Sequence, residues 1–132
     1  MKKRKTLVAA LILVFALSIP TFAATANFSA TIPAKQGDTE VSTVARAGGI
    51  QENQFFDITL QTLTAGYSSL RAWAEVGTGT NVSSPYQEAL VKHTTRMKYT
   101  RSVLPRVNVT LNLDNPVYTT SKLHATGQWT PY

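Results

Sequence analysis

Apolar and polar residues alternate along much of the chain beyond residue 27, which predicts β-strands with one buried face, because successive side chains point to opposite sides. The most regular example is residues 107–113, where valine and leucine alternate with asparagine and threonine up to a turn at 114–116. Gly127 marks a candidate β-bulge. The same period of two occurs, more or less regularly, in further segments: 28–32, 41–44, 56–60, 70–76 and 117–129.

Residues 86–103 carry mixed signals. The segment 87–92 contains helix-forming residues and follows Ser83, Ser84 and Pro85, which suit the start of a helix. Threonine, tyrosine and valine recur in the second half, and these residue types favour a strand. We interpret the core of this stretch as strand. The sequence therefore predicts an all-β fold, a single small antiparallel β-sandwich or a small barrel, with little helix.

The first 26 residues have the composition of an export signal. Residues 2–5 are all basic, and residues 7–19 form an uncharged apolar run that is shorter than the roughly 20 residues needed to span a bilayer. Small residues follow, as signal peptidase requires, so we expect cleavage after Ala23 or Ala26. The sequence thus predicts a signal-peptide helix within 1–26, a secreted domain at 27–132, and contact with the membrane only through the transient leader.

The leader changes the apparent charge of the chain. Of thirteen Lys and Arg residues, four lie in the leader, which leaves nine against seven Asp and Glu, so the net charge falls from +6 to +2. Export and this low charge argue against a nucleic-acid partner. The chain contains no cysteine, which excludes the disulfide framework of many small secreted animal domains and favours a bacterial export route.

Residue types that usually carry catalysis or bind metals are few. Beyond the leader there are two histidines, His93 and His124, and no zinc-site spacing, so the sequence predicts no metal, no other cofactor and no catalytic residue. We interpret both histidines as ordinary strand residues. A pair of acids that converges in space, as in glycosidases, stays open for the seven carboxylates: Asp38, Glu40, Glu52, Asp57, Glu75, Glu88 and Asp114.

A basic tract is the most informative feature. Five of the nine cations of the expected mature chain lie in a stretch without any acidic residue: Lys92, Arg96, Lys98, Arg101 and Arg106. On a strand, Arg96 and Lys98 share one face. Such a stripe attracts anionic wall polymers, lipid headgroups or glycans through Coulomb forces that weaken with salt. The alternative is a solvated face that keeps a sheet edge from pairing with its neighbours.

Aromatic residues offer a second candidate surface. Trp73 lies between Arg71 and Glu75 on the polar face of its predicted strand, which is unexpected for a tryptophan. Together with Tyr86 and Trp129, it is a candidate for an exposed platform that stacks on sugar rings. Packing in the core is the commoner use of tryptophan and is the alternative interpretation.

The layout of the chain resembles a group of small secreted proteins. A signal peptide, the absence of cysteine, Thr- and Tyr-rich strands and the ending Ala-Thr-Gly-Gln-Trp-Thr-Pro-Tyr at 125–132 resemble β-sandwich proteins of Gram-positive bacteria. That group includes the lactococcin-972-like bacteriocins. The resemblance implies a secreted sandwich that acts at the envelope of another cell, and it transfers no catalytic or binding residue.

These features lead to one expected function and two alternatives. We expect a secreted, non-enzymatic interaction protein that engages a component of the cell envelope or extracellular matrix through the basic tract and exposed aromatic residues. A bacteriocin- or toxin-like protein is the first alternative and follows from the resemblance. A small extracellular glycan-active enzyme is the second, because the seven carboxylates have no assigned role.

Overall fold

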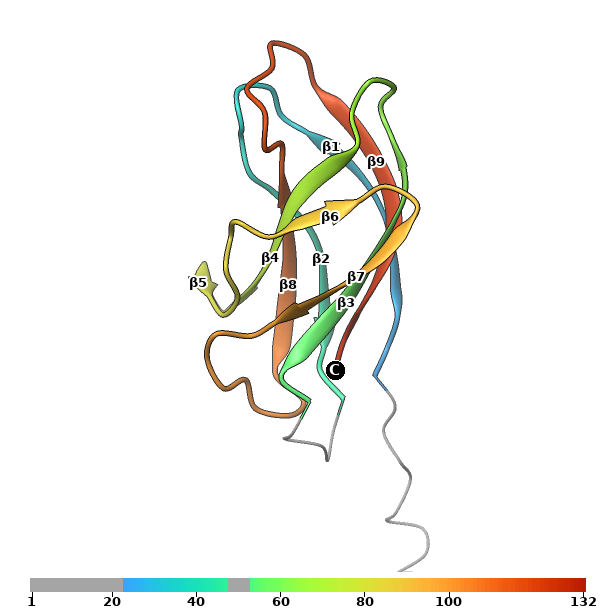
Figure 1. Ribbon diagram of the computed structural model, residues 1–132. Helices are drawn as coiled ribbons and strands as arrows, with labels where there is room; N and C mark the ends of the chain where they lie inside the picture. The colour runs from blue at the N-terminus through green and yellow to red at the C-terminus, as the bar shows by residue number, and fades with distance from the viewer. Residues whose placement is uncertain (1–22, 48–52) are drawn as a thin grey trace, which may run out of the picture.

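The computed structural model describes residues 23–47 and 53–132 (Figure 1). The expected signal-peptide helix, apart from residues 23–26, lies outside the described residues. Within the described ranges every regular element is a strand, and no helix is present that could span a membrane. The strands, in chain order, are β1 (Ala26–Ile32), β2 (Thr39–Ala45), β3 (Phe55–Leu63), β4 (Ser69–Val76), β5 (Thr80–Asn81), β6 (Glu88–Leu90), β7 (His93–Lys98), β8 (Asn108–Asp114) and β9 (Leu123–Pro131).

The strands form two antiparallel sheets. The four-stranded sheet has the order β1-β9-β3-β7, and the five-stranded sheet has the order β2-β8-β4-β5, with β6 also paired to β4. Figure 1 shows the chain passing repeatedly from one sheet to the other. Among the described residues the hydrogen-bonded ladders remain two separate sheets and do not close into a barrel. The predicted all-β antiparallel sandwich is therefore confirmed.

The core lies between the sheets and consists of the apolar residues of the alternating segments. In β3, Phe56, Ile58 and Leu60 are fully buried, and Leu111 and Leu113 of β8 are buried in the same core cluster. Each such side chain contributes about 1.5–3 kcal/mol by leaving water. The period of two thus places one face of each strand inward, as the sequence predicts.

The ambiguous stretch at 86–103 contains two strands that belong to different sheets. β6 pairs with β4 in the five-stranded sheet, whereas β7 pairs with β3 in the four-stranded sheet. Lys92 adopts a positive φ of 62° at the crossing, where its N–H donates to the carbonyl of Leu60. The strand interpretation is confirmed. The helix signal at 87–92 was wrong because this chain segment turns between the sheets.

Gly127 lies opposite an irregularity in the pairing of β3 with β9. The register shifts between Thr59 and Thr62, so that β3 carries the extra residue opposite Gly127. A Cβ atom at position 127 would lie 2.3 Å from the carbonyl oxygen of Thr59 and 2.6 Å from Cζ of Phe28. Glycine is therefore required here by close approach of its neighbours. β9 itself begins only at Leu123, so the predicted strand at 117–129 was too long at its start.

Candidate ligand-binding surfaces

The basic tract follows the edge of the four-stranded sheet. Lys92 lies in the turn before β7, Arg96 and Lys98 lie on β7, and the remaining two follow in the β7–β8 loop. β7 is the last strand in the order of its sheet, and all five side chains are exposed. We call this set the basic surface: Lys92, Arg96, Lys98, Arg101 and Arg106.

Arg96 differs from the rest of the basic surface because its charge is compensated. Its Nε and Nη2 donate to the two carboxylate oxygens of Asp57, at 2.8 and 2.9 Å. The guanidinium also lies over the ring of Phe55, 3.9 Å from its centroid. The hydrogen bond to Asp57 raises the pKa of Arg96 above its usual value. Within 23–47 and 53–132, the other four cations of the basic surface form no ion pair.

Hydroxyl side chains cover much of the outer face of the four-stranded sheet beside the basic surface. Three cross-strand threonine pairs are hydrogen-bonded there, with Oγ1–Oγ1 distances of 2.6–2.8 Å: Thr25–Thr130, Thr59–Thr94 and Thr62–Thr126. A hydroxyl has one donor and two acceptor positions, so each pair keeps hydrogen-bonding capacity for a ligand or water. The outer face is therefore polar and matches hydroxyl-bearing polymers.

The predicted aromatic platform is wrong for both tryptophans. Trp129 is 1% exposed in the core, where it packs edge-on against Phe56, and Trp73 is 4% exposed. Trp73 lies outside the main core cluster, and its Nε1 donates to Glu75 at 2.8 Å, which satisfies the polar end of a buried ring. Only Tyr86 of the three is exposed, at 77%. These side chains therefore provide no joint surface for stacking.

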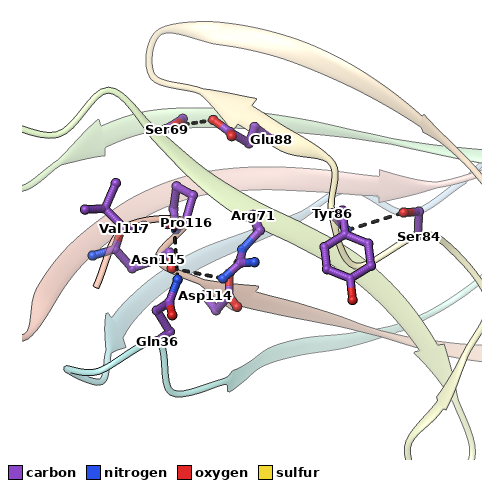
Figure 2. Close-up of polar contacts among 10 residues, drawn as sticks. All are labelled: Gln36, Ser69, Arg71, Ser84, Tyr86, Glu88, Asp114, Asn115, Pro116 and Val117. Atoms are coloured by element: carbon purple, nitrogen blue, oxygen red, sulfur yellow. Dashed lines mark hydrogen bonds and ion pairs between the residues drawn. The ribbon is translucent and has the colours of Figure 1, made fainter. Parts of the chain in front are cut away.

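Arg71 and Asp114 form a partly buried ion pair in the five-stranded sheet. Arg71 Nε donates to Asp114 Oδ1 at 2.7 Å, and its Nη2 donates to the carbonyl of Asn115 at 3.2 Å. Figure 2 shows Arg71 with Asn115 on one side and Tyr86 on the other. Burial raises the pKa of the Asp114 carboxyl above its usual value, although the Arg71 guanidinium acts in the opposite direction. This ion pair lies on the same face of the sheet as further acidic side chains.

The outer face of the five-stranded sheet is acidic. Its carboxylates alternate with core residues and share this face with Arg71: Glu40 pairs with Asn112 and Glu75 with Thr110, and Arg71 pairs with both Glu88 and Asp114. The hydroxyl of Ser69 donates to Glu88 at 2.6 Å, so this carboxylate is held by a neutral donor (Figure 2). We call this set the acidic face: Glu40, Glu75, Glu88 and Asp114. Glu52 lies outside the described residues.

Arg46 is an important residue that the sequence pattern did not reveal. It is 2% exposed and donates to the main-chain carbonyls of Asn53, Val103 and Tyr132. Its guanidinium lies 5.5 Å from the centroid of the Tyr99 ring, and burial lowers its pKa. Arg46 thus ties together the start of β3, the β7–β8 loop and the end of β9. A single arginine after a strand carries no local signal for this role.

The two histidines are exposed and bonded to nearby chain atoms. Nδ1 of His93 lies 3.0 Å from the carbonyl of Val91, and Nδ1 of His124 lies 3.1 Å from the hydroxyl of Thr31. In the part of the chain that the structure describes, no group of three or more His, Asp or Glu side chains could hold a metal ion. Both histidines are placed as strand residues by the structure.

No family model matches the chain, and neither curated proteins nor solved structures provide a significant match.

Proposed function

We propose that this chain is a secreted, non-enzymatic protein that binds an anionic polymer of a bacterial cell envelope through the basic surface. The observation that supports this most directly is the row of cations without ion pairs along β7 and its flanking loops. Cations without a partner in the protein attract an external polyanion more strongly than compensated ones. The bacteriocin-like and glycan-active alternatives remain predictions of the sequence.

The linear arrangement suits a polymer better than a compact anion. A strand rises about 3.3 Å per residue, so β7 extends over roughly 17 Å, with Lys92 just before it and Arg101 and Arg106 in the loop after it. Charges spread over that length match repeated charges along a chain, such as the phosphates of a teichoic acid. The threonine hydroxyls on the adjoining outer face offer hydrogen bonds to hydroxyl groups between such charges. Charge and polarity thus support the same ligand class.

The decisive variant reverses Lys98 and Arg101 to glutamate. Both are exposed and unpaired, whereas reversing Arg96 would place a second carboxylate beside Asp57 and disturb the sheet edge. Each basic residue near an anionic surface contributes about 1 kcal/mol, so we expect at least a tenfold weaker binding to purified walls, about 1.4 kcal/mol or more. Binding of the wild-type chain should weaken as salt rises.

The matched control reverses Lys35 and Lys122, which changes the net charge by the same amount. Both residues lie in loops at the opposite end of the sandwich from the β7–β8 loop (Figure 1). We expect this control to bind walls as the wild-type chain does. Equal binding by both double variants, or equal binding to walls stripped of anionic polymer, would contradict the proposal. Binding to anionic vesicles but not to walls would assign the surface to lipid instead.

A further inference from the structure

The acidic face and the part of the basic surface that lies on β7, Arg96 and Lys98, are on opposite sides of the sandwich. Met97 of β7 points into the core, so its neighbours Arg96 and Lys98 point outward from the four-stranded sheet. Glu40, Glu75 and Glu88 belong to the outer face of the other sheet. The outer faces of two stacked sheets point in opposite directions. The molecule therefore carries opposite charge on opposite sides.

The charges of the acidic face are largely uncompensated. Within the described ranges, ion pairs join only Arg71 to Asp114 and Arg96 to Asp57. Glu75 accepts from the indole of Trp73, which is neutral, and Glu88 accepts from a serine hydroxyl. Three carboxylates of the acidic face, and four cations of the basic surface, thus form no ion pair within the described ranges. The two surfaces are complementary in sign and similar in size of charge.

Exposed apolar side chains accompany both surfaces. Leu90 of β6 pairs with Ser69, which places it on the outer side with Glu88, and Tyr86, two residues before Glu88, is 77% exposed. On the other side, Leu104 is 57% exposed in the β7–β8 loop, between Arg101 and Arg106. Protein interfaces combine apolar contacts with complementary charges that fix orientation. A binding site for a small ion would not need these apolar neighbours.

We propose that the acidic face binds the basic surface of a second copy of this chain, so that copies associate head to tail. The two surfaces differ, so the contact is heterologous, and because they lie on opposite sides it does not close on two copies. Repetition of this contact produces an open-ended linear oligomer. The proposal does not rest on polymer binding, although an anionic polymer would compete for the same basic surface.

The test uses two variants that each reverse two charges on one of the two surfaces. Variant one is Lys98→Glu with Arg101→Glu, and variant two is Glu40→Lys with Glu88→Lys. In sedimentation velocity at about 0.02 M salt, where screening is weak, the wild-type chain should form oligomers that grow with concentration and dissociate at about 0.5 M salt. Each variant alone should stay monomeric because its altered surface has lost the excess charge that attracts the intact one.

Mixing the two variants provides the sharpest outcome. The acidic face of variant one is intact and meets the intact basic surface of variant two, so the equimolar mixture should associate again. The control with Lys35→Glu and Lys122→Glu should associate like the wild-type chain. Thermal unfolding identifies a misfolded variant, and Glu40→Lys with Glu75→Lys replaces variant two if Glu88→Lys prevents folding.

Three results would overturn the inference. They are a wild-type chain that stays monomeric at about 1 mM and low salt, association that persists in either folded variant, and a mixture that stays monomeric. Variant two also separates the two proposals, because it should lose self-association and still bind purified walls. Loss of wall binding by variant one with intact self-association would support the polymer proposal and contradict this one.

Discussion

The guanidinium carbon of Arg96 lies over the ring of Phe55, 3.9 Å from its centroid. Its two bonds to Asp57 hold it there, and Tyr132 lies beside the same ring, with centroids 4.9 Å apart. Arg96 is therefore the residue of the basic surface that is held most firmly by contacts within the protein, although it lies in the middle of that surface. We infer that it fixes the edge strand β7 and that its unpaired neighbours meet the ligand.

This division of roles predicts the effect of Arg96→Lys. Lysine keeps the charge but cannot form the paired bonds to Asp57 or stack a planar group on Phe55. We expect a lower melting temperature in thermal unfolding and nearly unchanged binding to anionic walls. A loss of binding as large as that of the Lys98 and Arg101 double variant would show instead that Arg96 contacts the polymer directly.

Arg46→Met should destabilise the whole sandwich. The substitution removes the donors to the carbonyls of Asn53 and Tyr132, whereas Val103 keeps a hydrogen bond from Gln54. Each buried acceptor left unpaired costs about 1–3 kcal/mol, so we expect a loss of about 3 kcal/mol in the free energy of unfolding. Urea titration measures it, and the exposed Arg101→Met is the control, with a change within about 0.5 kcal/mol. Equal stability of the two variants would refute the role of Arg46.

Gly127→Ala should destabilise the pairing of β9 with β3. The added methyl group would lie 2.3 Å from the carbonyl oxygen of Thr59, which is backbone and cannot rotate away. We expect a loss of about 3 kcal/mol in the free energy of unfolding, at the upper end of overpacking effects. Gln128→Ala on the partly exposed face of the same strand should change stability by less than about 1 kcal/mol. If Gly127→Ala unfolded at the same denaturant concentration as the wild-type chain, this would count against the close approach of position 127 to Thr59.

Asp114 should give the folded state a dependence on pH in the acidic range. Because burial raises its pKa, the folded chain retains this proton where the unfolded chain has released it. The stabilisation is present below the unfolded pKa and is lost as pH rises through the folded one. As the pH rises from about 3 to about 6, the stability of Asp114→Asn should therefore increase relative to that of the wild-type chain. Urea titration at each pH measures this difference in the free energy of unfolding. A constant difference across this range would contradict the raised pKa.

The contacts of β1 favour one of the two expected cleavage sites. Ala26 pairs with Trp129, and the hydroxyl of Thr25 lies 2.7 Å from that of Thr130. Cleavage after Ala23 keeps both contacts, whereas cleavage after Ala26 removes them. We expect the secreted chain to begin at Ala24, which an intact mass of the exported protein would show. A mass that corresponds to a start at Asn27 would contradict this.

The period of two predicted most of the strands and their buried faces, although it left 86–103 ambiguous and did not predict β5. Side chains alternate across any strand, so Phe56, Ile58, Leu111 and Leu113 had to share the inner side once the chain was extended. It also placed Arg96 and Lys98 together on the outside of a strand. These conclusions depend only on neighbours along the chain, and the local sequence therefore determines them.

The tertiary structure decided everything that depends on which strands meet. The backbone groups that pair two strands are the same in every residue, so the sequence does not show that β9 lies between β1 and β3. For that reason the burial of Trp73 and the three carbonyls around Arg46 were not visible in the pattern. The sequence by itself showed one charged surface, the basic tract. Only the pairing of β2, β4, β6 and β8 gathered scattered acids into the opposing face.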